Sequence, residues 1–363
     1  MAYPPFGESG KISVELSGKT RKDVKYASDF DTKLSSWVMP QGRPTNPGLV
    51  IYAMLDGSFS VWDPARNYRK QKENSPHEHI PAFVYTPSEV WKGKEESDGY
   101  KTCNGIVADL LYWLMEKAEP YQQLKAAIET LSPPNEQLTL GGITRMMDAQ
   151  RYACIRMPYK KHSDVPIVLL ASAIKRVLSI AYFLVWAWQE HKVACEKIGD
   201  ELTSDITIII DEVEAHLHPR WQKNILMMLQ KTVESLTKCT GIQYIVSTHS
   251  PLVMASCEDF FCEDDTWIDI DLVDGRVIAE KKDFTKKGDV SKWLLSDAFD
   301  LESTRSNHSQ HVLSEAQQLM GNPSFDPKAA RTMQEKLEVV LSSRDSFWLR
   351  WNVYLAKHNF TIE

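Results

Sequence analysis

Two adjacent carboxylates, Asp211 and Glu212, follow the β-branched run from Ile206 to Ile210. Such a run is typical of a strand that is covered on both faces of a parallel sheet. At the carboxyl edge of that sheet, the first acid could hold a metal ion and the second could direct a water molecule. The same string also fits a buried strand followed by acids that cap the next helix. The pair alone leaves both interpretations open.

A second polar cluster, Ser247 to Pro251, follows the next apolar run, which begins at Tyr244. The imidazole of His249 could reach a terminal phosphate, and the neighbouring hydroxyl groups could donate further hydrogen bonds. Taken alone, a histidine at the end of a strand is more often a structural residue. An amphipathic helix that begins at Pro219 separates the two runs, and strand, helix and strand predict a right-handed crossover.

The combined string resembles a known family. Asp-Glu-Val-Glu-Ala-His-Leu-His-Pro from Asp211, then a helix, a strand and Thr-His-Ser-Pro from Thr248, resembles the Walker B, D-loop and switch-histidine segments of ABC-type P-loop ATPases. The likeness covers residues 150–300 and points to bacterial AAA-labelled ATPases of the RecF-like and OLD-like group. It implies ATP as substrate and Mg²⁺ as cofactor.

The resemblance also assigns roles. Asp211 would hold Mg²⁺ through water, Glu212 would orient or deprotonate the attacking water, and His249 would sense the γ-phosphate. Three further residues would lie in the D-loop, which faces a partner subunit in this family: Glu214, His216 and His218. The resemblance therefore implies a homodimer or a partner ATPase half.

The family's signature motif should begin the long apolar helix, and Ser172 stands there. At a helix N-terminus, a serine and free N–H groups can bind the γ-phosphate held by the other subunit. The expected glycine is missing, and β-branched Ile174 cannot replace a glycine where the backbone must approach closely. Activation across the dimer through this motif is therefore in doubt.

The phosphate loop itself is not found. The sequence contains no G-x-x-x-x-G-K-[ST] string, in which backbone N–H groups and a lysine would hold the phosphates. Gly18-Lys19-Thr20 has Ser13 in place of the first glycine, and the alternation from Ile12 to Leu16 indicates a strand instead of a loop. The chain resembles a truncated family member that begins after its first motif, so another segment or a partner must supply the loop.

The elements that position these residues predict an α/β fold. The resemblance implies that this fold is the second half of an ABC-type P-loop NTPase head, with a β-rich N-terminal lobe, a helical insertion and a C-terminal helical segment. A hairpin with a type I′ turn at Asp56-Gly57 is expected near the start, and a helix buried on all sides spans Val177 to Trp188. The other expected elements are strands at 11–16, 82–85, 155–157, 167–170, 206–210 and 244–247, helices at 106–117 and 121–131, a hairpin at 267–279, and helices near 289–299, 309–320, 328–342 and 345–357.

Four parts are predicted from this order. They are a β-rich N-terminal lobe at 1–100, a helical insertion at 101–149, the ATPase core at 150–280 and a C-terminal helical segment at 281–363. The net charge of −7 provides no global basic field, so DNA binding would need a local patch. Two basic clusters could form one: Lys160-Lys161-His162 and the lysines at 281, 282, 286 and 287.

Several classes are disfavoured by composition. The longest apolar stretch, 165–188, is interrupted by Lys175 and Arg176, so no membrane helix is predicted. The first thirty residues lack the apolar region of a secretory signal, which favours a cytoplasmic protein. Six scattered cysteines without a C-x-x-C pair argue against disulfides and zinc ribbons, and favour reduced thiols, mostly buried.

Two other functions stay open. The chain could be a catalytically inactive remnant or an interaction subunit, in which case an unpaired sheet edge should be exposed. Alternatively, His216-x-His218 with Asp211 and Glu212 could form the metal site of a hydrolase. Two weaker patterns are interpreted as solvated side chains: His77-Glu78-His79 and Asp269-x-Asp271.

Overall fold

A computed structural model describes residues 10–16, 24–32, 36–37, 47–67, 82–97, 99–158 and 164–361. The chain divides into two compact units, Met1–Thr248 and His249–Glu363, and each is described by itself. Three of the sequence patterns above lie outside the described residues: Gly18-Lys19-Thr20, His77-Glu78-His79 and Lys160-Lys161-His162.

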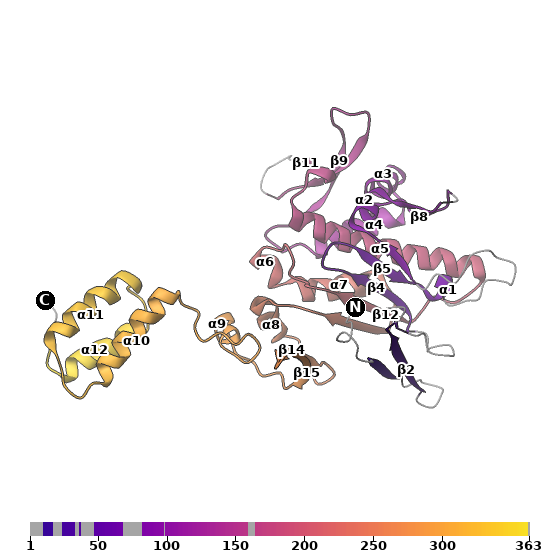
Figure 1. The fold of residues 1–363 in the computed structure, drawn as a ribbon. Coiled ribbons are helices and arrows are strands. Elements are labelled where there is room, and N and C mark those ends of the chain that lie inside the picture. Colours follow the sequence, from indigo (N-terminus) through magenta and orange to yellow (C-terminus); the bar gives the residue numbers. More distant parts are fainter. Residues whose placement is uncertain are drawn as a thin grey trace. The chain divides into compact units, whose positions relative to one another are not determined.

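A five-stranded sheet forms the centre of the first unit, in the order β13-β12-β4-β5-β6 (Figure 1). Strands β4 (Leu49–Ala53), β12 (Asp205–Ile210) and β13 (Gly241–Val246) run parallel to one another. Strands β5 (Phe59–Trp62) and β6 (Phe83–Tyr85) continue the sheet antiparallel. The fold is therefore of the mixed α/β class, and the two strands predicted to carry the acids and the histidine are neighbours.

The two faces of the parallel strands differ in burial. Ile206 pairs with Leu49 and Ile208 pairs with Ile51, so paired residues lie on the same face. On β4 and β12 one face is buried throughout, and the residues of β13 on the same face are half-buried. The buried residues are Leu49, Ile51, Ala53, Ile206, Ile208 and Ile210. The alternate residues are half-buried or exposed: Val50, Tyr52, Thr207, Ile209, Gln243 and Ile245. The sheet thus has one largely closed face and one face that is partly open.

Helix α5 (Ser172–Ile198) packs against the central sheet. Its residues from Val177 to Trp188 are all buried, which confirms the prediction from their apolar character. The ring of Phe183 stacks on Phe59 of β5, with ring centroids 4.3 Å apart. The helix begins at the predicted signature serine, so burial of its middle fixes where that serine lies.

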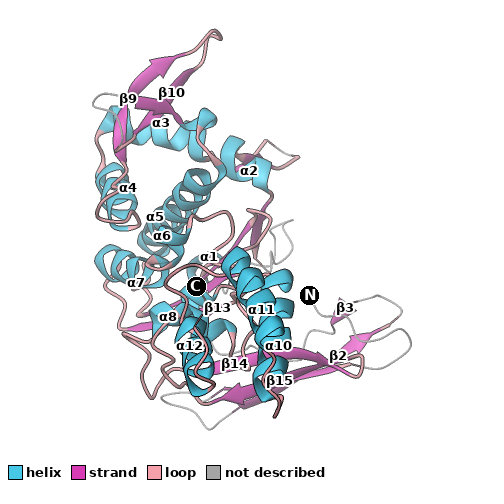
Figure 2. Cartoon of the chain, turned by 90° about the vertical axis from the view of Figure 1, so that its left-hand side faces the viewer, coloured by secondary structure: helices cyan, strands magenta, loops and turns pink. Residues whose placement is uncertain are grey.

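The remaining elements of the first unit surround this core. Figure 2 shows β9 and β10 beside α3, and α3 also contacts α4. The bounds are β1 (Lys11–Leu16), β2 (Val24–Asp31), β3 (Ser36–Trp37), α1 (Pro64–Asn67), α2 (Pro87–Lys92), β7 (Lys94–Glu95), β8 (Lys101–Cys103), α3 (Ile106–Glu116), α4 (Glu119–Thr130), β9 (Thr139–Arg145), β10 (Arg151–Arg156), β11 (Asp164–Pro166), α6 (Pro219–Gln222) and α7 (Ile225–Leu236).

The second unit contains a hairpin and a helical part. The helices α10, α11 and α12 share a core in which Trp351 and Leu337 are fully buried. Its elements are α8 (Pro251–Cys257), β14 (Trp267–Val273), β15 (Arg276–Lys282), α9 (Val290–Leu294), α10 (Asn307–Gly321), α11 (Pro327–Val340) and α12 (Phe347–Lys357). The predicted hairpin and C-terminal helices are confirmed, although α9 is shorter than expected.

Three local predictions are wrong. The turn between β4 and β5 is not of type I′, because Gly57 has a positive φ of 89° and Asp56 does not. The apolar run at 167–170 forms a 3-10 helix (Ile167–Leu169) instead of a strand, after Pro166 ends β11. The helix predicted from Pro219 is divided into α6 and α7. In addition, strand β9 was not predicted; its sequence contains two glycines.

All six cysteines are free, and three of them are fully buried. No helix among the described residues is both long and apolar enough to cross a bilayer.

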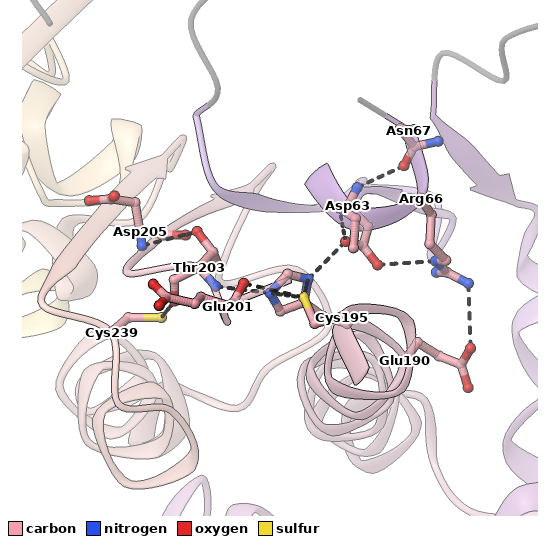
Figure 3. A network of polar contacts seen from close by, with 11 residues as sticks. Asp63, Arg66, Asn67, Glu190, Cys195, Glu201, Thr203, Asp205 and Cys239 are labelled. Carbon is pink, nitrogen blue, oxygen red and sulfur yellow. Dashed lines mark hydrogen bonds and ion pairs between the residues drawn. The ribbon is translucent and has the colours of Figure 1, made fainter. Parts of the chain in front are cut away.

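A buried polar network ties α5 to the turn after β5 and to the segment that leads into β12 (Figure 3). The backbone N–H of Thr203 donates to His191 Nε2 at 3.0 Å, so the ring proton is on Nδ1 and is donated to Asp63 Oδ1 at 2.8 Å. Asp63 Oδ2 accepts from Arg66 Nε at 3.1 Å. Cys195 Sγ lies 3.5 Å from His191 Nε2.

This arrangement resembles a thiol–imidazole–carboxylate triad but is structural. Asp63, His191 and Cys195 are at most 2% exposed, so no substrate reaches them. The lone pair that would accept the thiol proton is already used by Thr203. The network therefore fixes the segment before β12, and through it the position of the acids that follow.

We expect Asp63→Ala to lower the free energy of unfolding by about 3–5 kcal/mol, because the buried His191 and Arg66 donors lose their acceptor. Urea denaturation measures this change. Glu201→Ala, an exposed position in the same segment, is the control and should alter stability by less than about 0.5 kcal/mol. Equal effects of the two substitutions would contradict the structural role of Asp63.

Candidate functional site

The ends of three parallel strands bring the predicted acids to one rim of the central sheet. The N–H of Asp211 donates to Ala53 O at 2.9 Å, and the N–H of Ser247 donates to Ile210 O at 3.0 Å. Asp211, at the end of β12, therefore lies between the end of β4 and the end of β13. This rim is where ligands of open α/β sheets bind.

Ser247 links the two acids to β13. Its hydroxyl group donates to Asp211 Oδ1 at 2.6 Å and accepts from the N–H of Glu212 at 2.9 Å. A single hydroxyl thus orients the Asp211 carboxylate and fixes the backbone of Glu212. We call this arrangement the serine clamp.

The backbone at Glu212 is in the left-handed region, with φ of 48°. A residue other than glycine adopts this conformation at a cost of about 1–3 kcal/mol, and such residues cluster at functional sites. The N–H of Val213 donates to Ser247 O at 3.2 Å, which closes the sharp turn. The left-handed turn and the serine clamp therefore fix the backbone at Glu212.

The predicted D-loop follows this turn. Thr248 Oγ1 donates to Glu214 Oε2 at 2.6 Å, so the loop is joined to the end of β13 a second time. His216 is exposed and has φ of 65°, and His218 is the exposed N-cap of α6. Nothing in this geometry tests the contact of Glu214, His216 and His218 with a partner subunit, which stays a prediction.

Arg176, in the first turns of α5, holds two sides of the rim together. It is 5% exposed, its Nη1 donates to Met54 O at 2.6 Å, and its Nη2 donates to Asp211 O at 3.3 Å. Burial lowers the pKa of its guanidinium group, and the carboxylates of Asp56 and Asp211 oppose that shift. The turn after β4 and the end of β12 are thus fixed to each other by one buried cation.

The carboxylates of Asp56 and Asp211 both act on Tyr52 near the rim. The pKa of Tyr52 is raised by burial and by the negative charges of Asp211 and Asp56. The Asp56 carboxylate accepts from the N–H and from the hydroxyl group of Ser58, both at 2.8 Å. Carboxylate oxygens such as those of Asp56 and Asp211 are ligands that Mg²⁺ prefers.

Ser172 is the first residue of α5 and is exposed. The N-cap residue, Ala171, makes no capping hydrogen bond through its side chain. The serine is therefore at a helix N-terminus, where the sequence placed it. Its role toward a second subunit stays a prediction.

His249 is the first residue of the second unit, directly after Thr248, and its side chain is exposed. The three groups predicted to act together are therefore divided between the units, with Asp211 and Glu212 in the first. The function of His249 as a phosphate sensor stays a prediction.

The structure does not assemble the residues of the predicted hydrolase site into a set of metal ligands. Within the ranges that the structure describes, no group of three His, Cys, Asp or Glu side chains is placed to hold a metal ion. His218 Nδ1 instead accepts from the N–H of Arg220. An extended H-x-H segment would place both rings on one side, but the positive φ of His216 changes the direction of the chain.

The basic cluster on β15 is partly neutralised. Lys282 Nζ lies 2.9 Å from Glu280 Oε2 and 4.0 Å from Asp269 Oδ2. Asp269 and Asp271 lie on β14 of the hairpin, as expected for alternating acids on a strand. These contacts weaken the case for a DNA-binding patch on this hairpin.

The role of Arg176 was missed from the sequence, and Ser247 was expected to donate to a phosphate and not to hold Asp211 and Glu212. A hydroxyl residue at the end of a strand that neighbours the Asp211 strand was a usable signal, because the ends of parallel strands meet at one edge. Arg176 gave no comparable signal, since its partners are the carbonyl groups of Met54 and Asp211.

Comparisons with known proteins agree with the motifs. Residues 96–255 match the family described as "AAA domain, putative AbiEii toxin, Type IV TA system". A 94-residue stretch is 34% identical to the "Retron Ec83 probable ATPase" of Escherichia coli, covering 26% of this chain and 15% of that protein. A 49-residue stretch is 45% identical to the "Retron Vc95 probable ATPase" of Vibrio cholerae, covering 14% of this chain and 8% of that protein.

Among solved structures, the chain is similar to an SMC head domain from Thermotoga maritima, with 12% identity, a TM-score of 0.34, and coverage of 77% of this chain and 76% of that one. It is also similar to an SMC ATPase described in terms of ATP-driven dimerization and DNA-stimulated activation, with 16% identity, a TM-score of 0.32, and coverage of 48% and 90%. Residues 96–255 thus match an AAA domain, and shorter stretches are similar to parts of two probable ATPases.

We expect Arg176→Met to lower the free energy of unfolding by about 2–4 kcal/mol, because two buried carbonyl groups lose their donor. Lys175→Met is the matched control. Lys175 is half-buried and lies 5.6 Å from the centre of the Trp91 ring, so its loss should cost less than about 1 kcal/mol. Chemical denaturation compares the two, and similar costs would contradict the role of Arg176.

Ser247→Ala should speed hydrogen exchange at the Glu212 amide and lower stability by about 0.5–1.5 kcal/mol, because that N–H loses its acceptor. Amide exchange followed by mass spectrometry or NMR measures the effect. Ser204→Ala removes another exposed serine–aspartate bond, at the opposite end of β12, and should leave Glu212 unchanged. Unchanged exchange in Ser247→Ala would show that the serine clamp does not hold the acids.

Proposed function

We propose that this chain, whose central segment is that of an ABC-type P-loop ATPase, contributes the metal-binding and water-activating half of a Mg-ATP hydrolysis site. Another segment or a partner supplies the phosphate loop. The observation that carries this proposal is the serine clamp, which fixes Asp211 and Glu212 side by side at the rim of the parallel sheet.

The residues at the rim fit the cofactor. Mg²⁺ usually keeps several waters and is bound through one or two carboxylates together with substrate phosphates, so a dedicated protein cage is not needed. Asp211 supplies a carboxylate at the end of β12, and the hydroxyl group of Ser247 orients it. When bound, Mg²⁺ neutralises charge on the phosphates.

Glu212 is the general base of the proposal. Its carboxylate is one residue beyond Asp211, and the left-handed turn and the serine clamp fix its backbone. In this position it accepts a proton from, or orients, the water that attacks the terminal phosphorus atom. His249 would donate a hydrogen bond to the γ-phosphate.

Two surfaces of the chain would contact a second subunit. The exposed D-loop residues His216 and His218, together with Glu214, would face a second copy or a partner ATPase half. Ser172 and the N-terminus of α5 would bind the γ-phosphate held by that subunit. The missing glycine at this motif leaves the serine as its main polar group. DNA as a further ligand and a cytoplasmic location belong to the same proposal.

A catalytically inactive interaction subunit is the second candidate. The observation in its favour is that β13, with an apolar sequence, is an edge strand of the central sheet. Such a subunit would keep the rim and bind a partner without turnover.

Mg-ATP turnover of the chain and of Glu212→Gln tests the proposal. We expect the substitution to lower the rate by about 10²–10⁴-fold, because a general base is lost while the side chain keeps its size. Glu116→Gln, on an exposed part of α3, is the control and should keep the wild-type rate. Equal nonzero rates for wild type and Glu212→Gln would rule out the assigned base, and ATP binding without turnover would favour the inactive subunit.

A further inference from the structure

The predicted D-loop leads directly into helix α6. The N–H of Ala215 donates to Glu212 O at 2.8 Å, and the N–H of Leu217 donates to Glu214 O at 2.9 Å. Two consecutive turns thus carry the chain from the acids to His218, which is the N-cap of α6. The position of α6 therefore sets where the loop ends.

Helix α6 is too short to hold its own position. It spans four residues, Pro219–Gln222, and a single helical turn is marginal in water because nucleation fixes several dihedral angles for one hydrogen bond. The stability of α6 must therefore come from contacts with other elements. Two of its side chains, Arg220 and Trp221, make such a contact together.

Both side chains donate to the carboxylate of Glu136. Arg220 Nη1 donates to Glu136 Oε1 at 2.7 Å, and Trp221 Nε1 donates to Glu136 Oε2 at 3.1 Å. The Glu136 side chain is 11% exposed, whereas that of Arg220 is 69% exposed. Hydrogen bonds to a charged group are strong, and a largely buried acceptor strengthens them further. Glu136 is therefore the fixed partner to which α6 is attached.

The segment that carries Glu136, residues 131–138, joins α4 to β9 and is itself held in place. The N–H of Glu136 donates to Pro133 O at 2.8 Å, which closes a turn. The hydroxyl group of Ser132 donates to Ile128 O of α4 at 2.7 Å. The residue that attaches α6 thus belongs to the part of the chain that leads into the β9–β10–β11 sheet.

We propose that Glu136 is a positioning residue for the D-loop. Its carboxylate holds α6, and α6 holds the end of the loop at His218, while Thr248 holds the start of the loop through Glu214. A displacement of the segment that carries Glu136 therefore reaches the residues proposed to face a second subunit. This inference rests on the proposed function and adds a contact that controls the D-loop from outside the rim of the central sheet.

A purely structural role for Glu136 gives a different expectation. If the D-loop opens without breaking the bonds between Glu136 and α6, their loss lowers the free energy of global unfolding but leaves amide exchange in the loop unchanged. If those bonds hold the loop closed, opening breaks them, and their loss speeds exchange. Amide exchange in the D-loop therefore separates the two roles.

Hydrogen exchange at the Ala215 and Leu217 amides of the full chain, followed by NMR or mass spectrometry, tests the inference. Glu136→Gln keeps the size of the side chain but removes its charge and one acceptor oxygen, and should speed exchange at both amides about tenfold. Glu129→Gln is the matched control, because Glu129 accepts from Thr139 Oγ1 at 2.7 Å across the same segment. It should leave both amides unchanged.

A pair of variants at the exposed partner keeps the test valid if Glu136→Gln does not fold. Arg220→Met removes one donor to Glu136 and should speed exchange at Leu217 severalfold. Arg220→Lys keeps a cation that can donate to the same carboxylate and should exchange at a rate close to that of wild type. Circular dichroism verifies folding of each variant.

Mg-ATP turnover is the second measurement. Glu136→Gln should lower kcat about tenfold, because small displacements of residues around a reacting group are costly. Glu129→Gln should keep the wild-type kcat. Faster exchange in Glu136→Gln together with an unchanged kcat would overturn the positioning role.

The outcomes separate this inference from the proposed function. Unchanged exchange at Ala215 and Leu217 in Glu136→Gln, or equal acceleration in Glu129→Gln, overturns the positioning role even where Glu212→Gln abolishes turnover. Faster exchange in Glu136→Gln alone, with no turnover by wild type or with turnover that Glu212→Gln leaves unchanged, would keep the attachment of the D-loop to Glu136 and contradict the proposed function.

Discussion

The parallel pairing of β12 with β4 and β13 is the constraint on which the site depends. Because all three strands run the same way, their carboxyl ends meet, and Asp211, Ser247 and the turn after β4 lie at one rim. The serine clamp and the buried Arg176 convert this shared register into a fixed geometry. The serine clamp could not form if β13 were antiparallel or shifted by one residue, because Ser247 would then point to the other face or lie at the other end.

Buried hydrogen bonds hold the framework that supports the rim. The network of Asp63, His191 and Thr203 uses buried hydrogen bonds to join α5 to the segment that enters β12. The same helix provides Arg176 at its start, so α5 is fixed to the sheet at both ends of β12. The strained turn at Glu212 is therefore held by a well-supported framework, which is the condition under which a left-handed residue other than glycine persists.

Much of this could be predicted because the signals were local. Strand β12, the buried middle of α5 and the acids of the rim each followed from composition and period over a few residues. The turn at Asp56-Gly57 was assigned wrongly because the Asp-Gly pair fits several loop lengths, and the hydrogen bonds of Met54 and Ser58 decide between them. The strand predicted at residues 167–170 was wrong because an apolar run after a proline does not distinguish a strand from a 3-10 turn. Ser247 and Arg176 act through tertiary contacts across 35 to 122 residues, which no local pattern encodes.

The outer edge of β13 is unpaired among the residues that the structure describes. A sequence without the glycine-rich motif could belong to a closed domain with unrelated chemistry, in which case both faces and both edges of the sheet should be covered or protected. Instead, alternate backbone groups of β13 point outward, and Ile245 is half exposed beside them. Charge on long side chains or a proline would protect such an edge, and β13 (Gly-Ile-Gln-Tyr-Ile-Val) contains neither.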